Sequence, residues 1–242
     1  MKKLKVLDLF SGIGGFSLGL ERTGGFETVA FCEIDPFCQK VLKKHWPNVP
    51  IYNDVRTINY DGTIDVITGG FPCQDVSTAG SQAGIGKGTR TGLFREIIRI
   101  AESKGRPIII FENVSNFISG NGGEWFYSFL CALDEVGYNA EWFCITAASI
   151  GAAHERDRLW VVAYTNEAQF KRGSISSRIY EKHADFSDSC WGKDKPGVVR
   201  TLNGVPNQMD RVGALGNAVV PQIPEMIGYA ILEAENENSR TF

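Results

Sequence analysis

The sequence predicts an α/β protein in which a mixed, mostly parallel sheet carries helices on both faces. Short apolar runs, typical of buried strands, alternate along the chain with stretches of helical periodicity. Glycine-rich turns follow two of the predicted strands, at the sheet edge where open α/β proteins bind their ligands. The length of 242 residues suits one α/β domain with a small appendage.

The expected elements follow one another in a regular order. Strands are predicted at residues 5–10, 28–32, 49–52, 64–68, 107–111, 140–147 and 159–164, the last two as an antiparallel pair. Helices are predicted through residues 18–21 and at residues 36–46, 92–102, 124–136 and 222–233. The tail at residues 235–242 is expected to fray.

One stretch, residues 165–196, differs from the rest because it is polar and mixed in charge. We expect it to be a loop-rich excursion or a very small subdomain. Its basic side chains are interleaved with aromatic ones, which suits contact with nucleic acid. The alternative is a solvated loop.

Composition excludes several classes of protein. A net charge of −3 excludes a generally basic nucleic-acid coat, although it leaves room for a local basic groove. The six cysteines include no Cys-x-x-Cys pair, and no two histidines have ligand spacing, so disulfide and metal sites are not expected. No signal peptide or membrane span is recognisable, and a cytoplasmic protein without membrane association is expected.

The glycine turn at residues 11–15 offers free backbone N–H groups between a strand and a helix. Glu33 ends the next strand, 21 positions after Gly12, near the roughly 20 expected for an acid that binds ribose hydroxyls. The glycine spacing is not Gly-x-Gly-x-x-Gly, so a dinucleotide is not favoured. A cofactor with a ribose but no phosphate fits better, and S-adenosylmethionine is the obvious one. A purely structural turn is the alternative.

Two further strand ends carry reactive side chains. Cys73 follows the strand at residues 64–68 through a turn that contains Gly70 and Pro72, and Glu112 follows the strand at residues 107–111. Both belong to the same sheet edge. Glu112 is expected to be partly desolvated, so that its protonated form could persist and donate a hydrogen bond. The alternatives are a buried structural cysteine and a glutamate paired with a neighbouring arginine.

Three charged side chains could complete such a site. In an extended chain Arg156 and Arg158 point the same way while Asp157 points away. Asp54 ends the short third strand and could accept a hydrogen bond from an adenine amino group, with Val55 packed on the ring. A solvated charge run and a capping aspartate are the alternatives.

A thiolate, a proton-donating carboxyl, two arginines and an adenosine pocket together suit methylation at carbon 5 of a pyrimidine. Attack of the thiolate at C6 converts the ring to an enamine, which can take a methyl group from a sulfonium. Protonation at N3 of a cytosine by a nearby acid stabilises that adduct.

Five blocks in this order resemble the DNA (cytosine-5) methyltransferase family, in its small bacterial or phage form. They are DLFSGIGGF at residues 8–16, GFPCQ at 70–74, ENV at 112–114, RDR at 156–158 and GNAV at 216–219. The resemblance implies a Rossmann-like S-adenosylmethionine-dependent methyltransferase fold. His154 and Glu155 precede the RDR block where many members carry glutamine and a basic residue.

The resemblance also implies the roles of particular residues. Cys73 is the nucleophile, Glu112 binds the amine and N3 of a flipped cytosine, and Arg158 holds the ring oxygen. Arg156 braces the catalytic loop, while Pro72, Gln74 and Asn113 shape the site. Phe10 and Ile34 flank the adenine, and Glu33 takes the ribose hydroxyls. The full set implied for cofactor binding is Phe10, Ser11, Gly12, Ile13, Gly14, Gly15, Glu33, Ile34, Asp54, Val55, Gly70, Pro72, Leu93, Asn217 and Ala218.

A domain division and a set of partners follow from the same resemblance. Residues 1–164 and 207–242 are expected to form the catalytic domain, and residues 165–206 an abbreviated target-recognition region. The expected partners are double-stranded DNA, whose target base is flipped out, and a cognate restriction endonuclease of a restriction-modification system. The expected product is S-adenosyl-L-homocysteine, and the protein is expected to be a monomer in a bacterial cell, encoded by the host, a phage or a prophage.

Three rival functions stay open at this stage. The substrate could be RNA, although the sequence Pro72-Cys73-Gln74 favours DNA. The chain could be a catalytically idle DNA-binding relative. It could also be a nicotinamide oxidoreductase, which the glycine pattern disfavours.

Overall fold

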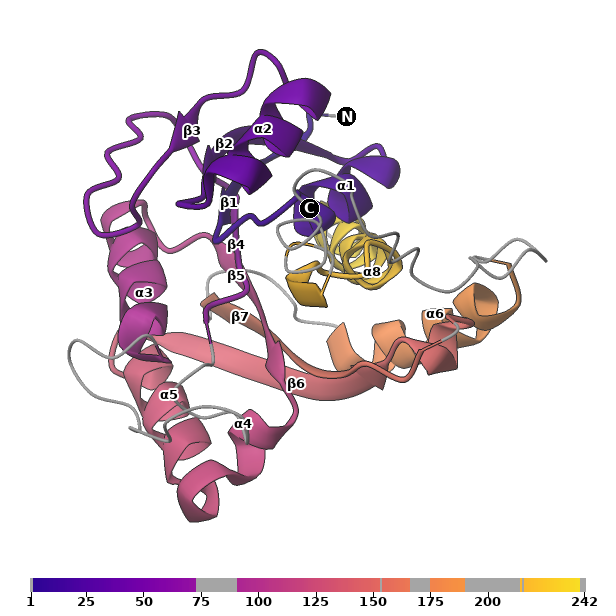
Figure 1. Ribbon diagram of the computed structural model, residues 1–242. Helices are drawn as coiled ribbons and strands as arrows, with labels where there is room; N and C mark the ends of the chain where they lie inside the picture. The colour runs from indigo at the N-terminus through magenta and orange to yellow at the C-terminus, as the bar shows by residue number, and fades with distance from the viewer. Residues whose placement is uncertain are drawn as a thin grey trace, which may run out of the picture.

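One seven-stranded sheet forms the centre of the molecule, in the order β3-β2-β1-β4-β5-β7-β6 (Figure 1). The computed structural model describes residues 2–72, 91–152, 154–165, 175–189, 214 and 216–239. The strands are β1 (Leu4–Leu9), β2 (Phe26–Cys32), β3 (Ile51–Tyr52), β4 (Val66–Gly69), β5 (Ile108–Val114), β6 (Tyr138–Thr146) and β7 (Asp157–Thr165). Strands β1 to β5 pair in parallel, whereas β7 pairs antiparallel with both β5 and β6. The predicted mixed, mostly parallel sheet and its final antiparallel pair are confirmed.

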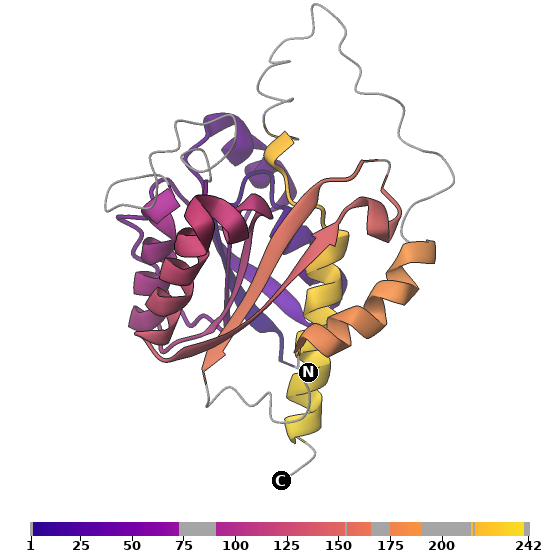
Figure 2. The ribbon, with the colours of Figure 1, turned by 90° about the horizontal axis from the view of Figure 1, so that it is seen from below.

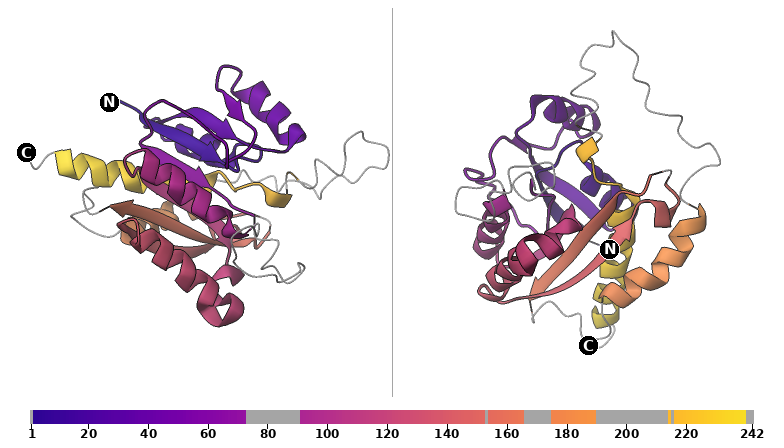
Figure 3. Two further views of the ribbon diagram at one scale, coloured as in Figure 1. Left: turned by 90° about the vertical axis from the view of Figure 1, so that its left-hand side faces the viewer. Right: turned by 60° about the horizontal axis from the view of Figure 1, so that its bottom comes forward.

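Helices cover both faces of this sheet, as Figures 1 and 2 show. The described α-helices are α1 (Gly15–Arg22), α2 (Pro36–His45), α3 (Phe94–Ser103), α4 (Asn116–Ser119), α5 (Glu124–Asp134), α6 (Ile175–Ser189) and α8 (Gln222–Ser239). Short 3-10 turns lie at Thr91–Leu93, Gly120–Gly123 and Ala148–Ile150. Helices α3 and α5 lie on one face, and α1, α6 and α8 lie on the other (Figure 3).

The two faces have separate apolar cores because side chains alternate along each strand. On β5, Ile109 and Phe111 join the core beneath α3 and α5. Ile108 and Ile110 join the core beneath α1 and α8. Since both faces are covered, the central strands read as continuous apolar runs, which is why the sequence located them.

Local chemistry sets the boundaries of the helices near the site. The Asp35 carboxylate caps α2 by accepting hydrogen bonds from the backbone N–H groups of Phe37 and Cys38, and Pro36 occupies the first turn. Gly19 of α1 allows α1 to lie directly against the start of α8, because a Cβ there would lie 2.1 Å from the Pro221 carbonyl oxygen. Helix α1 is therefore held close to the C-terminal segment of the chain.

Helix α6 was not predicted from the sequence, because its 15 residues are mostly polar. Among the side chains of α6 that the structure describes, residues 175–183, Ile175 and Ile179 are the buried apolar ones, 0% and 3% exposed and one helical turn apart. Its first N–H groups, those of Ile175 and Ser176, donate to the carboxylate of Glu141 on β6. This part of the region expected to contact DNA is therefore packed against the sheet.

The last helix continues beyond the predicted end. Residues 235–239, which the sequence suggested would fray, continue α8. Ala234 is buried, and Glu237 forms an ion pair of 2.7 Å with Arg178 of α6. The prediction of a frayed tail is wrong for this stretch because a helix distant in the sequence covers it. No helix among the described residues combines the length and apolar character that crossing a membrane requires.

Candidate active site

The candidate site lies at the edge of the sheet where the parallel strands end. Strand β1 lies between β2 and β4, so the strand order reverses beside it. A crevice at such a reversal is where open α/β sheets bind ligands. The turn after β1, the turn after β4 and the end of β5 meet at this edge, and the antiparallel β7 begins there.

The glycine turn after β1 is linked to the end of β2 by Glu33. The Gly12 N–H donates to one oxygen of the Glu33 carboxylate at 2.7 Å, and the Asp35 N–H donates to the other at 2.8 Å. The Glu33 carboxylate therefore lies against the glycine turn, 21 positions from Gly12 in the sequence. Phe10 and Gly12 both have a φ of 53°. That value is costly for a phenylalanine and is characteristic of functional sites.

Ser11 and Asp8 lie beneath this turn. Ser11 is buried; its hydroxyl donates to the Asp8 carbonyl at 2.6 Å and accepts from the Cys32 N–H, so it joins β1 to β2. The Asp8 side chain is fully buried and accepts hydrogen bonds from the hydroxyls of Ser17 and Thr68 at 2.7 and 2.8 Å. Burial raises the pKa of Asp8 to about 7. Sequence reasoning assigned Asp8 no role, although a carboxyl inside an apolar strand was a visible signal.

The surroundings of Glu33 suit an adenosyl group. Ile34 is 63% exposed and Phe10 is half-buried, so both can offer apolar surface to a flat ring. Asp54 lies at the end of β3, where Arg56 binds its carboxylate with a shortest N–O distance of 2.7 Å. Hydrogen bonds from Arg56 lower the pKa of Asp54. The side chain of Val55 is buried in the core beneath α3 and α5.

These residues fit S-adenosylmethionine on chemical grounds. Two carboxylates can accept from hydroxyl and amino groups, two apolar side chains can flank a ring, and a glycine turn permits close approach. No cluster of metal-binding side chains is found within the described ranges.

Glu112 lies at the end of β5 and is 8% exposed. Its Oε1 is 3.0 Å from Nε of Arg158, an ion pair between β5 and β7. Burial raises the pKa of Glu112, while Arg158 and Arg156 act in the opposite direction. The turn after β4 comes close to this carboxylate, since a Cβ on Gly70 would lie 3.2 Å from Oε2 of Glu112.

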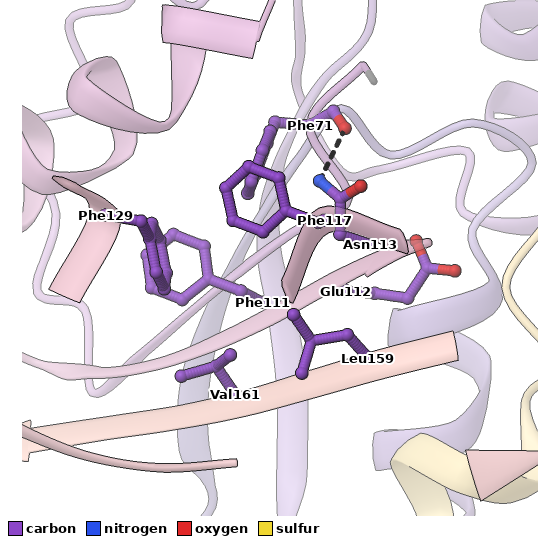
Figure 4. A pocket seen from close by; sticks show the side chains of 8 residues that line it. All are labelled: Phe71, Phe111, Glu112, Asn113, Phe117, Phe129, Leu159 and Val161. Atoms are coloured by element: carbon purple, nitrogen blue, oxygen red, sulfur yellow. Dashed lines mark hydrogen bonds between the residues drawn. The ribbon is translucent and has the colours of Figure 1, made fainter. Parts of the chain in front are cut away.

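Asn113 and Phe71 fix the start of the turn that leads to Cys73. The Asn113 amide donates to the Phe71 carbonyl at 3.4 Å, as Figure 4 shows. The Phe71 ring is buried among four other phenylalanine rings: those of Phe94, Phe111, Phe117 and Phe129. The hollow lined by the side chains in Figure 4 has no room for a water molecule. The aromatic cluster is therefore closely packed, and it fixes the ring of Phe71, the residue before Pro72.

Arg156 and Arg158 lie at the start of β7 and have different partners, because Arg156 does not have the extended backbone that was expected from the sequence. Arg156 and Arg158 are half-buried, and Asp157 between them is exposed. Arg156 has a φ of 34°, and its Nη1 donates to the Gly216 carbonyl at 2.5 Å. Sequence reasoning did not find this partner, because Gly216 is 60 positions away.

The remaining predicted site residues have various placements. Cys73 and Gln74 lie outside the residues that the structure describes. Leu93 is partly buried against the α3–α5 core, Asn217 is exposed and Ala218 is half-buried. Gly14 packs against Trp46, and Gly15 packs against Val219. Ile13 is half-buried in the turn.

The fold is Rossmann-like and is shared with solved methyltransferase structures. It is similar to DNMT2 of Spodoptera frugiperda, crystallised as a mutant, with a TM-score of 0.57 and 24% identity over 71% of this chain and 54% of that one. It is also similar to the S. pombe Dnmt2 methyltransferase, with a TM-score of 0.56 and 16% identity over 99% of this chain and 100% of that one. At these identities the similarity concerns the fold.

Sequence comparison then gives the family. The model of the C-5 cytosine-specific DNA methylase family matches residues 4–214, so the chain belongs to that family. It is 37% identical over 164 residues to the type II methyltransferase M2.BsuMI of Bacillus subtilis, covering 66% of this chain and 42% of the relative. It is 34% identical over 236 residues to the type II methyltransferase M.MspI of Moraxella sp, covering 86% of this chain and 56% of the relative. The chain thus spans about half the length of these curated relatives.

Proposed function

We propose that this chain is a DNA (cytosine-5-)-methyltransferase, which transfers a methyl group from S-adenosylmethionine to C5 of a cytosine flipped out of duplex DNA. The observation that carries the proposal is the ion pair between buried Glu112 and half-buried Arg158, beside the turn that leads to Cys73. A carboxyl with a raised pKa can donate a proton to N3 of a cytosine. The guanidinium beside it can bind the oxygen of the cytosine ring.

The proposed chemistry begins with the Cys73 thiolate. It adds to C6 of the cytosine, and the electron pair of the C5–C6 double bond moves into the ring, where it is stabilised because Glu112 delivers a proton at N3. Bound S-adenosylmethionine supplies an electrophilic methyl group to C5. Solvent water then takes the C5 proton, the electrons of that bond restore the C5–C6 double bond and expel the thiolate, and N3 returns its proton to Glu112. Arg158 orients the base and keeps Glu112 in place, and flipping the base costs a few kcal/mol.

For cofactor binding we propose the residues around the glycine turn. The Glu33 carboxylate accepts two backbone hydrogen bonds and retains capacity for ribose hydroxyls. Phe10 and Ile34 flank the adenine, and Asp54 accepts from its amino group while sharing its oxygens with Arg56. Gly70, Leu93, Asn217 and Ala218 are proposed for the methionine end.

We also propose double-stranded DNA as substrate, a restriction endonuclease as biological partner, a monomeric state and a cytoplasmic location. Residues 165–206 are the proposed recognition region. Within that region α6 packs on the core of the protein. We therefore assign recognition of the DNA sequence to the residues before and after α6 in the chain.

Methyl transfer from radiolabelled cofactor to duplex DNA or to tRNA tests the proposal. Incorporation of label into DNA would support the proposed function. Incorporation into tRNA alone would instead show that the protein is an RNA methyltransferase. Duplex containing 5-fluorocytosine should trap a covalent complex with the native chain. The complex should be absent in Cys73→Ser and retained in Cys144→Ser, whose cysteine is exposed on β6. Absence of both label and complex would indicate a catalytically idle relative.

A further inference from the structure

We propose that Arg156 is a positioning residue that fastens the segment at residues 216–220 over the glycine turn. The base pocket and the cofactor pocket are thereby joined through one side chain. This inference rests on the proposed function and adds a specific role to it. The resemblance to the family instead implied that Arg156 braces the catalytic loop.

The first observation is where the Arg156 side chain goes. Its neighbour Arg158 turns to Glu112, but the Arg156 guanidinium donates from Nη1 to the carbonyl of Gly216 at 2.5 Å. Such a bond between a cation and a carbonyl is stronger than one between neutral groups. The contact therefore connects the start of β7 with a segment 60 positions further along the chain.

The second observation is the strained backbone at Arg156. A φ of 34° lies in the left-handed region, which is unfavourable for any residue with a side chain and persists only where other contacts impose it. Contacts of this kind are present, since the Ala147 N–H donates to the carbonyls of Glu155 at 2.7 Å and Arg156 at 3.3 Å. The backbone of Arg156 is thus fixed by a hydrogen bond from the residue that follows β6, and its side chain binds Gly216.

The third observation concerns the far end of the link. A Cβ on Gly15 would lie 2.5 Å from the Val219 carbonyl oxygen, so the backbone of Val219 rests directly on the first residue of α1. Gly15 is also the last residue of the glycine turn whose Gly12 N–H holds Glu33. A continuous path thus runs from Arg156 through Gly216 and Val219 to the cofactor turn.

The consequence is that removing the Arg156 side chain releases the 216–220 segment and weakens cofactor binding even when no DNA is present. An arginine that only braced the catalytic loop would leave cofactor binding in free enzyme unchanged. The net value of a hydrogen bond to a charged group corresponds to roughly tenfold or more in an equilibrium constant. Because this bond is partly exposed to solvent, we expect about fivefold to tenfold.

The test measures binding of S-adenosylhomocysteine by calorimetry to the full chain without DNA. Arg156→Ala should raise the Kd about fivefold to tenfold, and Arg156→Lys, which keeps one donor, should restore it to within about twofold. Arg22→Ala is the matched control, because Arg22 also links α1 to the C-terminal helix, at Glu225, away from the site. Its Kd should equal that of the native chain.

Hydrogen exchange provides a second readout. Backbone amides at residues 217–220 should exchange faster in Arg156→Ala than in the native chain or in Arg22→Ala. If Arg156→Ala is unfolded by circular dichroism, Arg156→Gly replaces it, since glycine adopts a positive φ without strain.

The outcomes separate this inference from the proposed function. A native Kd and native exchange in a folded Arg156→Ala or Arg156→Gly variant would overturn the inference alone. Failure of the native chain to bind S-adenosylhomocysteine would overturn the proposed function, and the inference with it.

Discussion

Replacing Asp8 by asparagine should make the stability of this protein less dependent on pH. The Asp8 carboxyl is fully buried between β1, β4 and α1, where it accepts hydrogen bonds from Ser17 and Thr68. Burial raises its pKa from 3.8 to about 7, and the nearby negative charge of Glu33 adds to the shift. An amide of the same shape cannot ionise, and the two hydroxyls can each donate or accept.

The sign and size of the effect follow from linkage. The pKa of Asp8 is higher in the folded than in the unfolded chain, so folding favours its protonated form. Stability linked to this group is complete below about pH 4 and is lost as the pH rises towards 7. A shift of about three units corresponds to about 4 kcal/mol. The free energy of unfolding of Asp8→Asn, relative to the native chain, should therefore increase by about this amount between pH 4 and pH 8.

Urea unfolding followed by circular dichroism at several pH values measures this difference directly. The contributions of the other titrating groups to this difference in unfolding free energy cancel, because the native chain and the variant share those groups. Asp134→Asn, at an exposed position on α5, is the control for the effect of an aspartate-to-asparagine substitution itself. A difference for Asp8→Asn that stays constant from pH 4 to pH 8 would refute the reasoning.

Three further predictions concern the site and the unexpected helix. Glu112→Gln should lower methyl transfer about 100-fold or more while cofactor binding is kept, because the proton donor to N3 is lost; a variant that retains native turnover would exclude Glu112 as the acid. Ile34→Ser should weaken S-adenosylhomocysteine binding roughly fivefold, for about 1 kcal/mol of lost apolar contact, with little effect on thermal stability because Ile34 is 63% exposed. An unchanged Kd for S-adenosylhomocysteine would show that Ile34 does not contact the cofactor. Ile179→Ala should lower the free energy of unfolding by about 2–4 kcal/mol, whereas Tyr180→Ala, at an 83% exposed position on the same helix, should change it by less than about 0.5 kcal/mol. Equal effects in urea unfolding would mean that α6 does not pack as described.

Much of the candidate site could be predicted because its residues stand at the ends of recognisable strands. Glu33 and Glu112 each follow an apolar run, and parallel strands bring their ends to one edge. Helix α6 could not be predicted in the same way. Its two buried isoleucines are too few to give a helical pattern, and its caps and ion pairs come from β6 and α8.

The sequence by itself determined the order of the strands, the family and the residue types at the sheet edge. These depend on local periodicity and on motifs of a few neighbouring residues. Only the tertiary structure decided that Arg158 faces Glu112, that Arg156 reaches Gly216 and that α6 lies on α8. Each of these contacts joins residues more than 40 positions apart. Their partners are set by strand order and helix packing, and no local pattern in the sequence encodes that geometry.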